Sequence, residues 1–402
     1  MPGSRTAPPA VCGISAKVFL RKGVFDFMSE SIVKKRGREI NPDLIRFIAF
    51  LAVPTGHFYT HCGIYNAGYT GLTEFFVLFV RSFVNTGLAL FVMLTGYFQS
   101  HKKVSAKYYL GILRLLEMYL LASVLNLIYD RFYLHQAISI REFFSGIVNF
   151  TASEYSWYIL LYAGLFLMIP FLNLAYNSIS CRGHKKILII SMFILSALPS
   201  SFLNAYVNLV SFWWQRLWPI SFYFLGAYFA EYHPKMRPRK AFLILITALL
   251  IFCVYNFLFF DAAGPLVSVP ITSFLFAHES LQNAVISPLI FLWITNIDMS
   301  HCPGLITRGL AAVSKYTYGA FLFTSITDSF IYGWLNHFVP DIAMRYIFII
   351  PAVLLSFTSS LLIAYLADKL VTLIDRLLRP LMLRLTGWLY RLTAPDAPDI
   401  EK

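Results

Sequence analysis

The stretch Arg46-Phe-Ile-Ala-Phe-Leu-Ala-Val-Pro-Thr-Gly-His57 decides the fold class, because it sets a guanidinium and an imidazole inside one long apolar segment. At about 100° per residue, eleven residues return to within roughly 20° of the same helix face. The rise over them is about 16 Å, half the thickness of a bilayer core. Lipid penalises both groups, so such a pair within a membrane span indicates a functional site.

The composition of the chain is that of a membrane protein. Of its 402 residues, 58% are hydrophobic and only 13% are charged, whereas about a quarter of the residues in soluble globular proteins are charged. The net charge of +13 comes from basic residues in short segments between apolar stretches. There they set topology and meet anionic lipid, so we expect membrane lipids and no nucleic acid as partners.

Ten apolar segments are long enough to cross a bilayer, although the eighth is short. They predict an all-α fold, a polytopic membrane bundle of about ten transmembrane helices. The segments are 43–63, 79–99, 108–129, 155–176, 186–203, 217–232, 241–260, 284–297, 316–336 and 346–368.

The basic residues of the loops predict the orientation. With the N-terminus inside, twelve basic residues fall on inner loops and four on outer loops, a positive-inside pattern that places both termini in the cytoplasm. The inner set is Lys102, Lys103, Lys107, Arg182, Lys185, Lys186, Lys235, Arg237, Arg239, Lys240, Arg308 and Lys315, and the outer set is Arg131, Arg141, Arg216 and Arg345.

The chain divides into three parts. Residues 1–40 are expected to be a disordered basic cytoplasmic tail without a signal peptide, and translation starts at Met1 or at Met28. Residues 41–368 form the transmembrane domain. Residues 369–402 are expected to form a basic amphipathic helix on the inner leaflet, followed by a tail. The cysteines (Cys12, Cys62, Cys181, Cys253 and Cys302) are scattered and odd in number, which argues against a disulfide framework.

His57 is the candidate with the strongest chemistry. A histidine at this depth serves as a general base or proton relay, as a metal ligand, or as a hydrogen-bonding residue between helices. No HxxxH or HxxE pattern accompanies it, so no metal site is predicted. Arg46 either anchors the helix at lipid phosphate or binds a substrate. Pro54 and Gly56 are expected to loosen the helix and leave room for a bound group.

Two further groups of candidates lie in the second and third spans. Thr95, Gly96 and Tyr97 end the second span with a hydroxyl, a close backbone approach and an amphipathic ring, although small residues also serve helix packing. Arg114 either pairs with Glu117 or joins Arg46 in a basic pocket for a phosphorylated cosubstrate.

The remaining candidates are an aromatic pair at the predicted outer end of the fourth span and an acid within the ninth span. Trp157 and Tyr158 open the fourth span, where such a pair belongs to an aromatic belt or contacts a substrate. Asp328 is interpreted as a proton or ion site, or as the partner of a donor on a neighbouring helix.

These residues resemble the motifs of the membrane acyltransferase-3 family, the integral membrane O-acyltransferases of bacterial surface polysaccharides. The resemblance covers about residues 41–368. Its most specific elements are Arg46-x10-His57 and the segment Leu90 to Phe98. Weaker ones are the Arg114 segment, Trp157-Tyr158-Ile159-Leu160 through Ile169-Pro170-Phe171, Tyr223 to Tyr228, and Ser314 to Phe323.

The resemblance implies a function and a place in the cell. Cytoplasmic acyl-CoA, acetyl-CoA being the expected donor, would give its acyl group to a hydroxyl of a glycan or lipid-linked sugar, with no tightly bound cofactor. His57 would be the base, and Arg46 and Arg114 would favour the donor's phosphates or the acyl carbonyl. The chain would be a multi-pass protein of the bacterial inner membrane.

The chain departs from the family at position 111, a glycine where members often carry a second basic residue, and at Glu117 and Met118. A transporter or flippase of polysaccharide or lipid-linked sugar is the alternative function. The absence of internal repeats in the sequence disfavours it.

Overall fold

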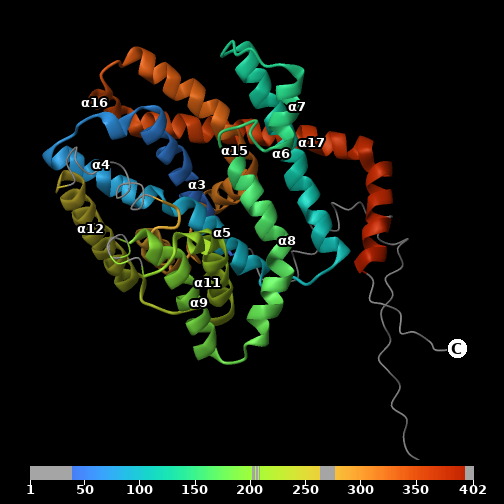
Figure 1. Cartoon of the computed structure of the whole chain (residues 1–402), viewed down its shortest axis with the longest axis horizontal. Coiled ribbons are helices and arrows are strands. Elements are labelled where there is room, and N and C mark those ends of the chain that lie inside the picture. Colours follow the sequence, from blue (N-terminus) through green and yellow to red (C-terminus); the bar gives the residue numbers. More distant parts are fainter. Residues whose placement is uncertain (1–38, 202–203, 205–206, 208, 263–276, 394–402) are drawn as a thin grey trace, which may run out of the picture.

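The computed structural model describes residues 39–201, 204, 207, 209–262 and 277–393 (Figure 1), and only the backbone of residues 66, 259–262 and 375–393. The predicted tail up to residue 38 and the last residues, 394–402, lie outside this part. Within it the chain forms helices and no strand.

The helices follow one another with short connections. They are α3 (Ile40–His61), α4 (Gly71–Val84), α5 (Thr86–Gln99), α6 (Ala106–Phe132), α7 (Ile140–Val148), α8 (Ser156–Ser178), α9 (Arg182–Ala197), α11 (Trp218–Tyr232), α12 (Pro238–Ala262), α14 (Leu281–Thr295), α15 (Gly304–Phe338), α16 (Ile342–Arg345) and α17 (Ile349–Thr393), with single 3-10 turns between some of them.

In the part of the chain that the structure describes, helix covers most of each range that the hydropathy pattern predicts, although in the fifth range, 186–203, α9 ends at Ala197. In the described part of the chain, five helical stretches are long and apolar enough to cross a membrane. They are Gly71–Gln99, Ala106–Phe132, Ser156–Ser178, Pro238–Leu258 and Ile342–Ile374. The all-α prediction is therefore confirmed for these residues. The number of spans and the cytoplasmic side of the termini stay predictions.

The second and ninth predicted spans differ most from their predicted bounds. The second span, predicted as 79–99, begins at Gly71 and is divided at Asn85 into α4 and α5. The ninth predicted span belongs to α15, which begins at Gly304 instead of 316, because the helix also includes the mixed polar and apolar residues before the span. The segment 369–392, predicted as an amphipathic helix, is helical and forms the last part of α17, which ends at Thr393; its position on the inner leaflet stays a prediction.

Helix α3 lies at the centre of the bundle, where it packs against α4, α5, α14, α15 and α17 (Figure 1). Its buried residues Ile45, Ala49, Ala52 and Val53 follow the 3.6-residue period of an amphipathic helix. The small side chains among them allow close neighbours. An ideal Cβ at Gly87 of α5 would lie 2.7 Å from the carbonyl oxygen of Ala49.

A second close contact joins α5 to α11. A Cβ at Gly96 would overlap the carbonyl oxygen of Tyr223, and a Cβ at Gly226 would overlap the carbonyl oxygen of Met93. The two glycines therefore let two backbones touch, as small residues do in membrane helix pairs. This contact fixes the end of α5 that carries the Thr95 segment.

Candidate functional site

His57 of α3 is held by a carboxylate from α15. Its Nδ1 lies 2.6 Å from Oδ2 of Asp328, a residue with 0% exposure. The hydroxyl of Ser356 in α17 donates to the other carboxylate oxygen of Asp328. A carboxylate at Nδ1 selects the tautomer that carries its proton there, which leaves the Nε2 lone pair to accept a proton.

An aromatic ring covers one face of the imidazole. The ring of Tyr155, which precedes α8, stacks on His57 with centroids 3.7 Å apart. The hydroxyl of Tyr155 lies 2.7 Å from Nε2 of His61, and the same nitrogen lies 3.5 Å from the exposed carboxylate of Glu154. Polar contacts thus run from the Tyr155 hydroxyl through His61 to an exposed acid, and the stacked ring of Tyr155 joins them to His57.

Arg46 and His57 both reach α15, which agrees with the shared face predicted from their spacing. Arg46 donates to Ser314 over 2.8 Å, and His57 contacts Asp328 fourteen residues further along α15. From the first contact to the second, the residue numbers rise along both helices, so α3 and α15 run parallel. The predicted topology agrees with this, because every second span of the chain crosses the membrane in the same direction and the first and ninth spans are therefore parallel.

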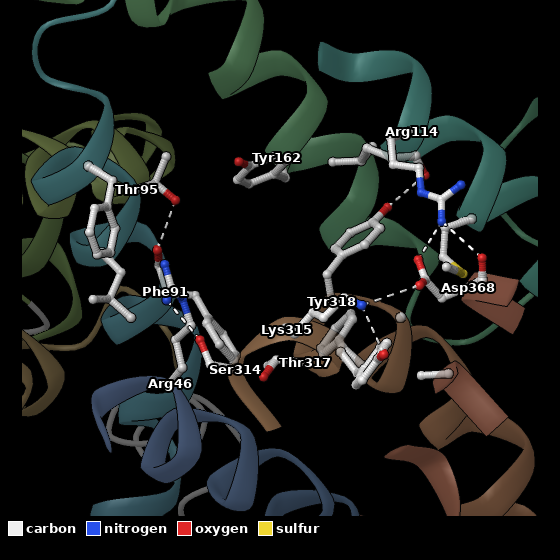
Figure 2. Close-up of a pocket in the computed structure, with 18 of the residues that line it drawn as sticks. Arg46, Phe91, Thr95, Arg114, Tyr162, Ser314, Lys315, Thr317, Tyr318 and Asp368 are labelled. Atoms are coloured by element: carbon white, nitrogen blue, oxygen red, sulfur yellow. Dashed lines mark hydrogen bonds and ion pairs between the residues drawn. The ribbon is translucent and has the colours of Figure 1, made fainter. Parts of the chain in front are cut away.

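A cavity of about 480 Å³ lies between α3, α5, α6, α8, α15 and α17. Figure 2 shows Arg46 on one side of it, with Ser314 and Thr95, and Arg114, Lys315 and Asp368 on the other side. The lining also includes Phe91, Phe98, Gly111, Met118, Tyr158, Tyr162, Thr317, Tyr318 and Phe321.

The Arg46 side of the cavity has a guanidinium held from three directions. Besides Ser314, Asp43 lies 3.2 Å from Nη1, and the ring of Phe98 lies 4.8 Å from the guanidinium carbon. Asp43 is buried, while Arg46 stays partly exposed to the cavity. These contacts fix the position of the charge at the edge of the cavity.

The opposite side carries Arg114 together with acids. Arg114 donates to the carboxylate of Asp368 and, over 3.2 Å, to the backbone oxygen of the same residue. Glu117 is a more distant partner at 3.9 Å. The geometry is compatible with both interpretations of Arg114, and its role toward a phosphorylated cosubstrate stays a prediction. The arginine faces Glu117, and it shares the cavity lining with Arg46.

Three aromatic rings connect the cavity with His57. Tyr158 and Phe321 line the cavity with centroids 5.1 Å apart, and Phe321 lies 6.4 Å from Tyr155, the ring stacked on His57. His57 itself is absent from the lining and keeps 18% of its side chain exposed. A series of ring contacts through Phe321 and Tyr155 therefore joins the cavity lining to the imidazole.

The predicted Thr95-Gly96-Tyr97 segment is divided among three environments. Thr95 lines the cavity and donates to the carbonyl oxygen of Phe91 over 2.9 Å. Gly96 lies in the contact between α5 and α11. Tyr97 points to another groove, where its hydroxyl donates to Glu39 over 3.0 Å. Only the threonine shares the cavity with Arg46.

The residues of the predicted aromatic pair also separate. Tyr158 is buried and lines the cavity, whereas Trp157 is 41% exposed and stacks on His278 with centroids 5.4 Å apart. The space expected beside Gly56 is occupied, because a Cβ there would lie 2.9 Å from the side chain of Val84.

Sequence reasoning did not identify every residue that the structure brings to this region. For Asp328 it offered a donor on a neighbouring helix as one possible partner without naming His57. It gave Asp368 no role, and Lys315 only a role in setting the topology. A signal was present for Tyr155, because Tyr155, Tyr158 and Tyr162 recur at the spacing of one helix face.

The comparisons with known proteins bear on this geometry. A protein-family model, acyltransferase-3, described as an acyltransferase domain, matches residues 39–368. The match begins one residue before α3 and ends at Asp368, so it contains His57, its carboxylate partner and the whole cavity. Curated proteins and solved structures gave no significant match.

Proposed function

The chain belongs to the acyltransferase-3 family, and from this premise we propose that it is an O-acyltransferase embedded in a bacterial inner membrane. It moves an acyl group, acetyl being the expected one, from cytoplasmic acyl-CoA to a hydroxyl of a glycan or lipid-linked sugar. His57 acts as the general base.

The contact between His57 and the buried Asp328 is the observation that carries this proposal. A carboxylate at Nδ1 orients the imidazole and stabilises the imidazolium that forms when Nε2 takes a proton. Within the described residues, Nε2 has no hydrogen-bond partner. It is therefore available to the hydroxyl of an acceptor.

The reaction then follows from the position of the base. Nε2 of His57 takes the proton of the acceptor hydroxyl as the oxygen attacks the thioester carbonyl carbon. Collapse of the tetrahedral intermediate forms the C–O bond of the ester and breaks the C–S bond. The thiolate of CoA leaves with the electron pair and receives the proton from His57.

The cavity suits the phosphorylated end of the donor. Arg46 lies eleven residues from His57, a rise of about 16 Å along the helix, so it is too distant to contact an acyl carbonyl at the imidazole. Arg46 and Arg114 instead suit the phosphates, and the long pantetheine arm would extend toward His57. In this arrangement the rings of Tyr158 and Phe321 must rotate to admit the thioester.

The cavity also agrees with a cytoplasmic donor. Arg46, Arg114 and Asp368 all come from the predicted cytoplasmic ends of their spans. Acyl-CoA would therefore enter from the side on which it is made, and it would reach the base about half a bilayer deeper.

The test is acyl transfer in membrane vesicles supplied with labelled acetyl-CoA. We expect His57→Ala to lower the transfer rate by about 10²- to 10⁴-fold, the usual contribution of a general base. His184→Ala, at an exposed position of α9, is the matched control and should transfer normally. Transfer by His57→Ala at the wild-type rate would contradict the proposed role.

A further inference from the structure

Asp368 is the acidic residue in the lining of the cavity, which also carries Arg46, Arg114 and Lys315. It faces two cations from different helices, Arg114 of α6 and Lys315 of α15 (Figure 2). Arg114 donates to its carboxylate, and Nζ of Lys315 lies 3.9 Å from the second carboxylate oxygen. A negative group thus already contacts both cations on this side of the cavity.

The contacts of Asp368 are exchangeable. The side chains of Arg114, Asp368 and Lys315 are 22%, 23% and 59% exposed. Ion pairs that water reaches are weak, because solvent screens them. Arg114 also keeps partners that do not depend on this carboxylate, namely the backbone oxygen of Asp368 and the hydroxyl of Thr372 at 3.4 Å.

We infer that Asp368 is an internal competitor for the phosphate groups of acyl-CoA, and that Lys315 is a donor-binding residue which this carboxylate neutralises in the free protein. The inference rests on the proposed function, because it takes the donor to be a CoA thioester. Donor binding displaces the carboxylate into water and gives Arg114 and Lys315 to the phosphates.

This arrangement selects ligands by charge. A small monoanion would interact with the two cations about as favourably as the carboxylate of Asp368 already does, so it would displace this carboxylate poorly. A pyrophosphate brings more charge to the same pair, and the donor can also reach Arg46 on the opposite side. Polyphosphorylated ligands are therefore favoured over the simple anions of the cytoplasm.

A purely structural role for the same contacts makes a different prediction. Arg114 and Asp368 join α6 to α17, two helices that pack together. If the ion pair only holds these helices, removing the charge of Asp368 lowers the stability of the fold and leaves the affinity for CoA unchanged or weaker. A competitor predicts a higher affinity, so the sign of the change distinguishes the two roles.

The experiment measures equilibrium binding of CoA to the purified full chain in lipid nanodiscs by titration calorimetry. We expect Asp368→Asn to bind CoA about 3- to 10-fold more tightly, as the loss of one partly exposed competing charge allows. Lys315→Gln should bind CoA several-fold more weakly. Pantetheine, which lacks the phosphates, should bind all three proteins equally.

Asp298→Asn is the matched control, because it removes the same charge from an exposed loop on the predicted cytoplasmic side. It should leave CoA binding unchanged. Thermal unfolding confirms that each variant is folded. If Asp368→Asn does not fold, Lys315→Gln decides, since CoA binding equal to wild type in that variant overturns the inference.

The outcomes separate the two proposals. Unchanged or weaker CoA binding by folded Asp368→Asn overturns the competitor role, while CoA binding by the wild type still supports the proposed function. Absence of CoA binding by the wild-type protein overturns the donor assignment, and the competitor role with it.

Discussion

Asp328 is the residue on which the chemistry of His57 depends most. Replacing it with asparagine keeps the size of the side chain but removes the charge that orients the imidazole and stabilises its protonated form. We expect Asp328→Asn to lower the turnover rate by about 10²- to 10³-fold, with little change in the KM for acyl-CoA. Steady-state transfer kinetics measure both quantities. Asp341→Asn, at an exposed position, is the control.

Tyr155 allows a test of which contact holds the imidazole in place. Tyr155→Phe keeps the ring stacked on His57 and loses only the contact with His61. We expect it to retain activity within a few-fold, whereas Tyr155→Ala should lose about tenfold or more, because the imidazole loses its packing. An equal loss of transfer activity in the two variants would show that activity depends on the hydroxyl of Tyr155 and not on its stacked ring.

At the scale of helices, the pair α5 and α11 depends on two glycines. An alanine at position 96 or 226 would force its methyl group into the carbonyl of the facing helix. We expect either Gly96→Ala or Gly226→Ala to destabilise the protein by about 1–3 kcal/mol, the usual cost of overpacking. Thermal unfolding in detergent measures the change.

The control for this prediction is Gly164→Ala in α8, where no heavy atom lies within 4 Å of an added Cβ. It should be neutral or slightly stabilising, since alanine favours helix formation. Wild-type stability of Gly96→Ala would show that α5 and α11 can move apart without any loss of stability.

Much of the helical structure was predictable from the sequence, and the contacts between helices were not. Long apolar segments predicted the helical ranges, because each is a local property of the chain. The partner of His57 lies 271 positions away and the partner of Arg114 lies 254 positions away. Hydropathy does not encode such pairings; it indicated only that buried charged residues need partners.

The sequence also could not separate neighbours with different roles. Thr95, Gly96 and Tyr97 are consecutive, but a helix turns by about 100° per residue, so they face the cavity, α11 and another groove. By contrast, Arg46 and His57 were predictable as one face, because their spacing is close to a whole number of turns.

At the scale of the whole molecule, the predicted topology places Cys181 in the cytoplasm. The backbone N–H groups of His184 and Gly183 lower the pKa of its exposed thiol, so more of it is thiolate at neutral pH and reacts with maleimide. We expect an impermeant maleimide to label a variant retaining only Cys181 in inside-out vesicles. Labelling should fail in right-side-out vesicles, and a second variant that retains only the buried Cys253 should stay unlabelled in both kinds of vesicle. Labelling of Cys181 from outside would reverse the topology.

The central claim is that His57 and Asp328 act together as one base in acyl transfer. A double-mutant cycle of transfer rates with labelled acetyl-CoA tests it most directly, using His57→Ala, Asp328→Asn and the combined variant. Since Asp328 acts through His57, we predict that the combined variant is no slower than His57→Ala alone. Losses that multiply in the combined variant, or a His57→Ala protein as fast as wild type, would contradict the claim.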